Sequence, residues 1–331
     1  MMDSSEKRAK KILVCGATGF IGRNIVEYFA DQKGYDVVGV HHIRPPFNHP
    51  GVDWVQGDLT QAQDVDRCLE GVDILVMAAA TTSGSKDILS RPHIHITDNA
   101  VMNSLLLRAA FEKKIQHVVF FSCTVIYQSS ETPLKEDAFD ASQELVPAYF
   151  GGGWTKIYIE KMCEFFSRIS KVKFTVIRHS NIYGPYDKFD LDRSHFFGAT
   201  ITKVMTTQDA KVVVWGKGEE KRDLLYVADL VNFVACLIER QQTPFEIYNC
   251  GYGQALSIRE VTRKIVQHSG RDLTIEHDLS KVSIPTFLAL DCSKAEKELG
   301  WKVQTTLEEG IALTIAWWKK HIGHHDAKPN T

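Results

Sequence analysis

The sequence lacks a cysteine pair at zinc-site spacing and lacks a long apolar run. Its seven cysteines are odd in number and scattered among apolar residues, which favours buried reduced thiols over disulfides, and we expect no bound metal. No segment approaches the roughly 18 apolar residues that a membrane-spanning helix needs. Residues 1–8 are charged and lack the apolar core of a secretory signal. These absences predict a soluble, cytoplasmic protein without a membrane partner.

A surplus of charge of one sign is also absent. The formal net charge is -2 at pH 7, whereas a nucleic-acid-binding domain shows a strongly basic face. We therefore expect no nucleic-acid partner, and any anionic ligand must be met by local cations. With 331 residues, 44% of them hydrophobic, the chain can bury a large core in one domain or in two interlocked lobes.

Short β-branched segments alternate with helical stretches through the first half of the chain. Strands are expected at 11–15, 37–40, 52–55, 74–77, 118–121 and 174–177, and helices at 21–30, 61–69, 98–113 and 154–169. Near-continuous apolar strands that alternate with helices are typical of a parallel sheet covered on both faces. The sequence therefore predicts an α/β fold with a doubly wound parallel sheet.

The rhythm changes from about Tyr183, where polar loops, short strands and scattered helices follow. We expect a smaller C-terminal α/β lobe that packs tightly on the first, because nothing resembles a flexible linker. The first domain is placed at 1–182 and the second at 183–331, with 224–250 returning to the first. The tail from His324 is polar, and we expect it to be solvated.

Three glycines follow the first expected strand, in the run Gly16-Ala17-Thr18-Gly19-Phe20-Ile21-Gly22. Glycine permits a tight turn and lets the backbone approach a pyrophosphate at a helix N-terminus, where amide groups attract anions. The pattern alone could be a plain strand–turn–helix, but its place in an alternating α/β sequence favours a dinucleotide site. The residues expected to bind the dinucleotide here are Gly16, Thr18, Gly19, Phe20, Ile21 and Gly22.

The spacing of these glycines resembles the extended short-chain dehydrogenases/reductases, the family of nucleotide-sugar epimerases and dehydratases. Further matches run through nearly the whole chain, so the resemblance implies a Rossmann sheet. It also implies cofactor contacts after the third and fourth strands, and an asparagine that props the active-site helix. These further cofactor-site residues are Asp58, Leu59, Ala78, Ala79, Ala80 and Asn99.

The end of the second strand lacks the carboxylate that would accept hydrogen bonds from the 2′-hydroxyl of NAD. It carries His41, His42 and Arg44 instead. These cationic groups favour the 2′-phosphate of NADP, although they could also form only a solvated loop. We expect NADP(H) to be preferred over NAD(H), with His41 and Arg44 among its contacts.

The stretch 181–195 and the block 213–223 closely resemble the GDP-sugar epimerase/reductases, the group that includes GDP-L-fucose synthase. The resemblance implies a GDP-sugar substrate and makes His195 an acid/base. The implied substrate-binding residues are Asn181, His195, Lys203, Trp215 and Arg222. Arginine and lysine can supply charge-assisted bonds to a diphosphate, and histidine can move a proton beside a 4-keto group. The alternatives are that His195 only hydrogen-bonds the substrate and that Lys203 is solvated.

The hydride chemistry of this family rests on a Ser or Thr, a Tyr, and a Lys four residues after the Tyr. Here Lys156 matches the lysine, but the tyrosine position is Gly152, which has no phenol. The hydroxyl position falls on Cys123, a weaker hydrogen-bond donor than serine. A shift of one residue would let Ser122 or Thr124 serve instead, and Cys123 could be an inert buried thiol. The catalytic candidates are Lys156, Cys123, Thr124 and His195.

Other groups could replace the phenol. Tyr149 lies seven residues before Lys156, nominally two helical turns, but we expect the three glycines between them to form a loop before the helix. Tyr158 points to a different face, and a water molecule could occupy the space of the ring. Three functions remain open: a GDP-sugar epimerase/reductase with a rearranged proton relay, a nucleotide-sugar-binding protein that has lost hydride transfer, and an epimerase without redox chemistry.

The helix that follows Lys156 is apolar on more than one stripe, at Ile157, Ile159, Met162, Cys163, Phe165 and Phe166. Two buried faces are therefore expected, one against the sheet and one against another subunit. In related proteins this helix joins the Asn99 helix in a four-helix interface. We expect a homodimer.

Overall fold

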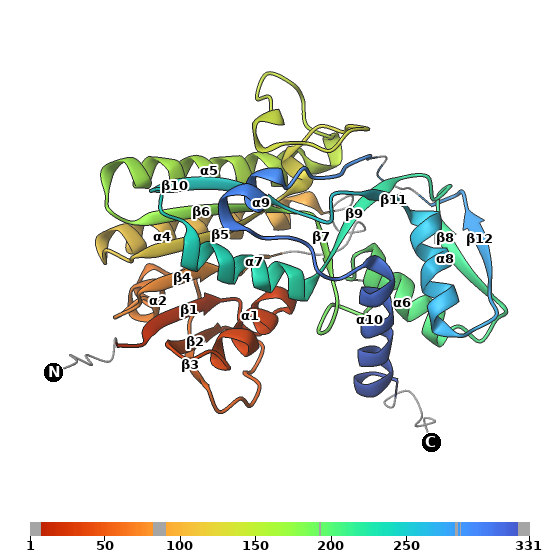
Figure 1. Cartoon of the computed structure of the whole chain (residues 1–331), viewed down its shortest axis with the longest axis horizontal. Coiled ribbons are helices and arrows are strands. Elements are labelled where there is room, and N and C mark those ends of the chain that lie inside the picture. Colours follow the sequence, from red (N-terminus) through yellow and green to blue (C-terminus); the bar gives the residue numbers. More distant parts are fainter. Residues whose placement is uncertain (1–7, 82–90, 192, 282–283, 285, 324–331) are drawn as a thin grey trace.

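The computed structural model describes residues 8–81, 91–191, 193–281, 284 and 286–323, so the start of the chain and the tail from His324 lie outside it. Its main layer is a seven-stranded parallel sheet with the order β10-β6-β5-β4-β1-β2-β3 (Figure 1). The strands are β1 (Lys10–Cys15), β2 (Tyr35–His41), β3 (Val52–Gln56), β4 (Ile74–Met77), β5 (His117–Cys123), β6 (Lys173–His179) and β10 (Phe245–Cys250). The predicted doubly wound sheet is confirmed.

Helices cover both faces of this sheet (Figure 1). One face carries α1 (Phe20–Ala30), α7 (Val227–Arg240) and α9 (Ser293–Leu299), and the other carries α2 (Ala62–Cys68), α4 (Thr97–Glu112) and α5 (Phe150–Ile169). Successive strand residues point to opposite faces, so on β5 Val119 and Phe121 join the first core while Val118 and Phe120 join the second. Burial on both faces is the reason why these strands are apolar throughout.

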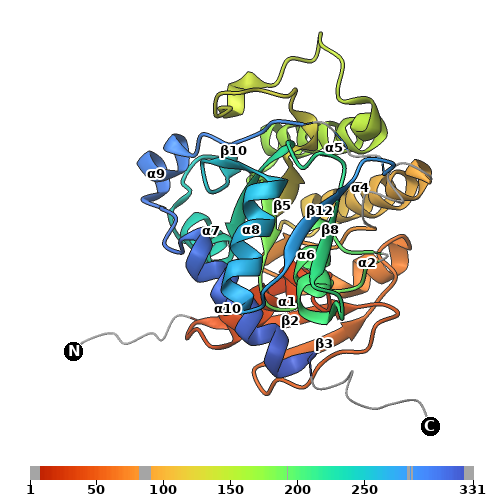
Figure 2. The same ribbon diagram turned by 90° about the vertical axis from the view of Figure 1, so that its right-hand side faces the viewer.

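The second lobe lies beside the carboxyl end of the large sheet and has its own core (Figure 2). Its helices are α6 (Phe196–Thr206), α8 (Ile258–Ser269) and α10 (Leu307–His321). Its short sheets pair β7 (Asn181–Tyr183), β9 (Lys221–Tyr226) and β11 (Ala255–Ser257), and separately β8 (Lys211–Trp215) and β12 (Thr274–Asp278). Between β9 and β11 in the sequence, the chain returns to the large sheet as β10, which pairs with β6. No described helix is both long and apolar enough to cross a membrane.

The prediction of a glycine loop before α5 is wrong, because the helix begins at Phe150 and includes all three glycines. A 3-10 turn, η4 (Pro147–Tyr149), leads directly into it. A Cβ on Gly153 would lie 2.5 Å from Leu145 Cδ1, and one on Gly151 would lie 2.7 Å from Ile96 Cδ1. Close packing therefore requires small residues at Gly151 and Gly153. It overrides the low helix propensity of glycine, which costs about 1 kcal/mol per residue.

Candidate active site

The strands β1, β4, β5 and β6 end at one edge of the sheet, where the strand order changes direction. The chain passes from β1 to β2 on one side and places β4 and β5 on the other. In open α/β sheets ligands bind in the crevice at such a switch point. This end of the sheet is therefore the candidate site.

The turn after β1 fits a pyrophosphate. Gly16 has a φ of +73°, and a Cβ there would lie 2.7 Å from Ala79 Cα and 2.9 Å from Ala78 O. Gly19 precedes α1 in an extended conformation, and the first turn of α1 holds no acidic side chain and no side-chain cap. Its first amide groups are thus left to an anion. The small residues Ala78 and Ala79 permit this close approach of the two segments.

Two arginines lie beside this turn, around a cavity of about 230 Å³. The Nη1 atom of Arg44 donates a hydrogen bond to Thr18 O at 2.8 Å. The guanidinium of Arg23 lies 3.8 Å from the ring centroid of Tyr186, and Trp317 of α10 completes the wall. Arg23 was not predicted from the sequence, although its position four residues after Gly19, one helical turn into α1, was a usable signal.

The other expected cofactor residues differ in their surroundings. His41 is half-buried, and its Nδ1 has no hydrogen-bond partner among the described residues. Asp58 accepts hydrogen bonds from the amide and the hydroxyl of Thr60, which lower the pKa of its carboxyl group. Leu59 is buried in the core, and Ala80 is exposed. Each of them lies at the carboxyl side of its strand.

Asn99 on α4 fixes backbone segments. Its Oδ1 accepts from Thr81 N at 3.0 Å, and its Nδ2 donates to Thr81 O and to His95 O, both at 2.9 Å. It thereby joins the segment after β4 to the 3-10 turn η1 (Pro92–His95). These contacts make Asn99 a positioning residue for the chain that borders the site.

Lys156 points toward the end of β5. Its Nζ donates to Phe121 O at 2.6 Å and lies 4.8 Å from the ring centroid of Phe120. Burial lowers the pKa of this ammonium group, while Cys123 and Glu160 act in the opposite direction. Lys156 and Cys123 are therefore brought together, and Thr124 follows as the half-buried first residue of η2 (Thr124–Ile126).

The alternative that Ser122 supplies the hydroxyl is wrong. Its Oγ donates to Glu160 Oε1 at 2.5 Å, on the opposite face of β5 from Cys123. Glu160 forms an ion pair with Arg178 at 2.7 Å, and both side chains are buried. Ser122 thus completes a buried network that holds α5 against β5 and β6.

His179 is a site residue that the sequence argument missed. It ends β6 directly opposite Cys123 on β5. Its Nδ1 makes a hydrogen bond of 2.7 Å with Ser180 O, so Nε2 is the ring nitrogen left for other partners. Burial, together with the charges of Lys156 and His195, lowers the pKa of His179 to about 4. The shared strand ends were the available signal, but pairing β5 with β6 required the topology.

His195 precedes α6 on the substrate side. The residue is exposed to solvent, although enough protein surrounds the ring to disfavour its charged form. Burial first, and then Lys188 and His95, lower its pKa to about 4. The lowered pKa keeps the imidazole neutral at pH 7 and able to accept a proton.

Lys203 and Trp215 lie together on the second lobe. Lys203 Nζ donates to Val213 O at 3.0 Å and lies 5.3 Å from the ring centroid of Trp215. The indole is 41% exposed, so part of its ring is accessible to a ligand. An aromatic face beside a cation can hold a planar, electron-rich base.

Arg222 is anchored to the backbone. Its guanidinium donates to Thr286 O at 2.8 Å and to Ile284 O at 2.9 Å. Burial lowers its pKa, and Tyr149 and Glu220 oppose this effect. The exposed Asn181 donates from Nδ2 to Asp223 O at 3.2 Å. Both residues are thus held by backbone carbonyl groups, and Arg222 lies close enough to the phenol of Tyr149 to interact electrostatically.

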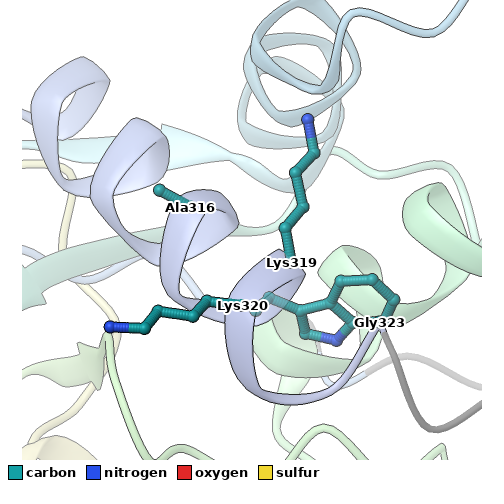
Figure 3. Close-up of a pocket in the computed structure, with 5 residues that line it drawn as sticks. Ala316, Lys319, Lys320 and Gly323 are labelled. Atoms are coloured by element: carbon teal, nitrogen blue, oxygen red, sulfur yellow. The ribbon is translucent and has the colours of Figure 1, made fainter.

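A separate hollow lies at the C-terminal end of α10 (Figure 3). It is lined by Ala316, Trp318, Lys319, Lys320 and Gly323. The ammonium groups of Lys319 and Lys320 extend in different directions, and the hollow is open to solvent. A binding site needs convergent polar groups in an enclosed space, so the crevice at the sheet edge is the better candidate.

The sequence matches the family model described as "NAD dependent epimerase/dehydratase family" over residues 12–251. Two relatives are each 28% identical to it: GDP-L-colitose synthase of Yersinia pseudotuberculosis, with 93% of this chain and 97% of that protein covered, and GDP-L-fucose synthase of Sinorhizobium fredii, with 92% and 93% covered. Among solved structures, UDP-glucose 4-epimerase of Thermotoga maritima shares the fold with a TM-score of 0.82 at 22% identity, over 94% of this chain and 99% of that chain. MoeE5 in complex with UDP-glucuronic acid and NAD also has a TM-score of 0.82, at 23% identity, over 94% and 100%. The match from β1 through β10, together with the glycine turn and Lys156 at the edge of the sheet, shows that the chain belongs to the NAD dependent epimerase/dehydratase family.

Proposed function

We propose that the protein is an NADP(H)-dependent nucleotide-sugar epimerase/reductase that acts at or next to a 4-keto group, with a proton relay that does not use the usual tyrosine position. The observation that carries the proposal is the convergence of Lys156, Cys123 and His179 at one sheet edge. The glycine turn lies at the same edge. Residues 1–182, with 224–250, would form the cofactor lobe, and the rest would form the substrate lobe.

The substrate is proposed to be a GDP-sugar. The similarity to proteins named GDP-L-colitose synthase and GDP-L-fucose synthase supports this choice. Arg222 and Asn181 would bind the diphosphate, and Trp215 with Lys203 would contact the base. A guanidinium is suited to phosphate because its donors match phosphate geometry.

Different residues would bind the cofactor and move the protons. When bound, the reduced cofactor supplies a hydride, and Arg44 beside the glycine turn would meet its 2′-phosphate. Lys156 would hold the cofactor ribose. His195, whose imidazole is neutral at pH 7, would accept a proton from the carbon next to the keto group. The phenol that usually protonates the sugar oxygen has no counterpart at Gly152.

Two measurements test this proposal. Mass spectrometry of nucleotides released on denaturation should identify NADP(H), and titration calorimetry should give tighter binding for GDP-mannose than for UDP-glucose or dTDP-glucose. Tightest binding of UDP-glucose would refute the GDP-sugar assignment. If both ligands bind but no NADPH is oxidised with a GDP-4-keto sugar, hydride transfer is absent, and the two other candidates remain: a nucleotide-sugar-binding protein and an epimerase without redox chemistry.

The proposal includes a homodimer in the cytoplasm. The outward side of α4 and α5 exposes large apolar groups: Val101, Tyr158, Phe165 and Ile169. An apolar stripe of this kind across two helices suits a four-helix interface. All seven cysteines are free thiols, which suits a reducing compartment. Light scattering at micromolar concentration should give twice the chain mass, and a monomer would contradict the dimer.

A further inference from the structure

A phenol stands one helical turn before the empty tyrosine position. Tyr149 directly precedes α5, and η4 leads into that helix without a break. Tyr149, Gly152 and Lys156 are spaced by three and four residues, and the glycines between them are helical. Residues at these spacings share one face of a helix.

The space beside Gly152 is open. A Cβ built on Gly152 meets nothing within 4 Å apart from the chain immediately around it, whereas Gly151 and Gly153 are both crowded. Of the three glycines, the one that faces free space is therefore the one at the family's tyrosine position. No side chain of the preceding turn fills this room, so it is open to a ligand or to another rotamer of Tyr149.

The surroundings of Tyr149 suit a proton donor. The residue is half-buried, and it lies close enough to Arg222 and Cys123 to interact with both electrostatically, while Cys123 also interacts with Lys156. Burial raises the pKa of the phenol, Arg222 lowers it and Cys123 raises it. The group is thus protonated at neutral pH, and the guanidinium of Arg222 lies near enough to stabilise the phenolate that remains after proton transfer.

We propose that Tyr149 supplies the phenol that Gly152 lacks and acts as the catalytic proton donor to the sugar oxygen. This inference rests on the proposed function. Hydride from the reduced nicotinamide dinucleotide forms a C–H bond at the keto carbon, and the electron pair of the C=O π bond moves to oxygen. The Tyr149 O–H bond breaks as its proton joins that oxygen, and solvent later reprotonates the phenolate. The nicotinamide is oxidised and the ketone is reduced to an alcohol.

Tyr158 provides a matched control. It lies on the same helix but is 45% exposed, and its hydroxyl is 3.2 Å from Ser104 Oγ on the α4 side. It is two residues beyond Lys156 and so points to another face. Removal of its hydroxyl leaves the site unchanged.

The test uses the full-length variants Tyr149→Phe, Tyr158→Phe and Tyr149→Phe/Gly152→Tyr. Single-turnover NADPH oxidation with GDP-4-keto-6-deoxy-mannose should slow by about 10²–10⁴-fold in Tyr149→Phe, the usual size of general acid catalysis. Tyr158→Phe should match the parent, and the double variant should recover most of the rate because it restores a phenol one turn from Lys156. The parent rate should fall at high pH as Tyr149 ionises, and Tyr149→Phe should lose this dependence.

A second readout does not depend on turnover. Ultraviolet titration of tyrosinate, compared between the parent and Tyr149→Phe, should show a phenol whose pKa shifts when NADP⁺ and GDP-mannose bind, and this component should be absent from Tyr149→Phe. Absence of the shift in the parent would refute the inference. An active parent with an equally active Tyr149→Phe variant would overturn this inference alone, whereas a parent that never oxidises NADPH would overturn the proposed function as well.

Discussion

The two glycine clusters that border the site differ in what surrounds them. In the turn after β1, a Cβ on Gly16 would meet the backbone of Ala79, and one on Gly22 would meet Gly16 O. At the start of α5, Gly151 and Gly153 are crowded mainly by side chains, and Gly152 faces open space. The fold therefore requires the first cluster strictly and the second only in part. The absence of a phenol at Gly152 does not result from lack of room.

The largest effect should come from Gly16→Ala. Its left-handed backbone alone should cost about 1–3 kcal/mol, and the displaced Ala79 backbone should weaken dinucleotide binding by at least about tenfold, or 1.4 kcal/mol. Urea unfolding and calorimetry with NADPH measure the two effects. Gly34→Ala is the control, because Gly34 has a φ of +94° but no neighbour within 4 Å. If both variants bind NADPH like the parent, the crowding at Gly16 has no role in the cofactor site.

The next largest effect should come from Arg44→Ala, which tests whether the site beside the first glycine cluster prefers NADPH or NADH. Arg44→Ala should weaken NADPH binding by roughly tenfold and NADH binding far less, because charge-assisted hydrogen bonds contribute about 1.5–3 kcal/mol. Calorimetry with both cofactors gives the ratio. Arg108→Ala, which removes an exposed arginine paired with Glu112 on α4, should change neither affinity. Equal losses for both cofactors would overturn the preference for NADP(H).

A smaller effect separates the glycines within α5. Gly152→Ala should raise the free energy of unfolding by about 0.5–1 kcal/mol, since alanine is the better helix former and has room. Gly153→Ala should lower it, because the new methyl group meets Leu145 and Val125 O. The two variants share one helical turn and control for each other. Equal changes in urea unfolding would mean that packing does not distinguish them.

The smallest effect concerns Asp187, in the wall of the cavity beside the first cluster. Burial raises the pKa of its carboxyl from 3.8 to about 7, although a bond from the Lys188 amide opposes this. The folded state thus favours the protonated form, and this contribution to stability is complete below about pH 4 and lost as the pH rises through 7. Asp187→Asn stays neutral, so its Tm should fall less between pH 4 and 8, by a few degrees at most. If the Tm of the parent and the Tm of Asp187→Asn change equally with pH, the raised pKa of Asp187 is contradicted.

The cofactor end was predictable because its signals are local. Alternating apolar strands specify the sheet, and the glycines follow one strand and open one helix, so neighbours in sequence are neighbours in space. The burial pattern of β5 and β6 and the close contacts of Gly16 agree with this prediction. Arg23 was within reach of the same argument.

The catalytic end depended on packing that the sequence does not display. His179 lies opposite Cys123 only because β5 and β6 pair in one register. Ser122 is diverted by a buried carboxylate on α5, a contact between residues far apart in the chain. The low helix propensity of glycine predicted a loop before Lys156, but these glycines are helical. Two of them pack closely in that helix, Gly153 against Leu145 and Gly151 against Ile96. Each difference arises from a tertiary contact that overrides a local preference.

The wall that Trp317 adds to the cavity beside the glycine turn has a consequence for biosynthesis. Thr18 and Gly19 belong to the first strand–turn–helix that leaves the ribosome, whereas Trp317 belongs to the last described helix. The indole stacks on Phe189 and His321 and meets Tyr186 edge-on, and Tyr186 packs against Arg23. A nascent chain that has reached only α9 lacks this wall, so the cavity beside the glycine turn is complete only after α10 has been translated and docked. Under the proposed function, tight binding of the dinucleotide would therefore require the last described helix to be in place.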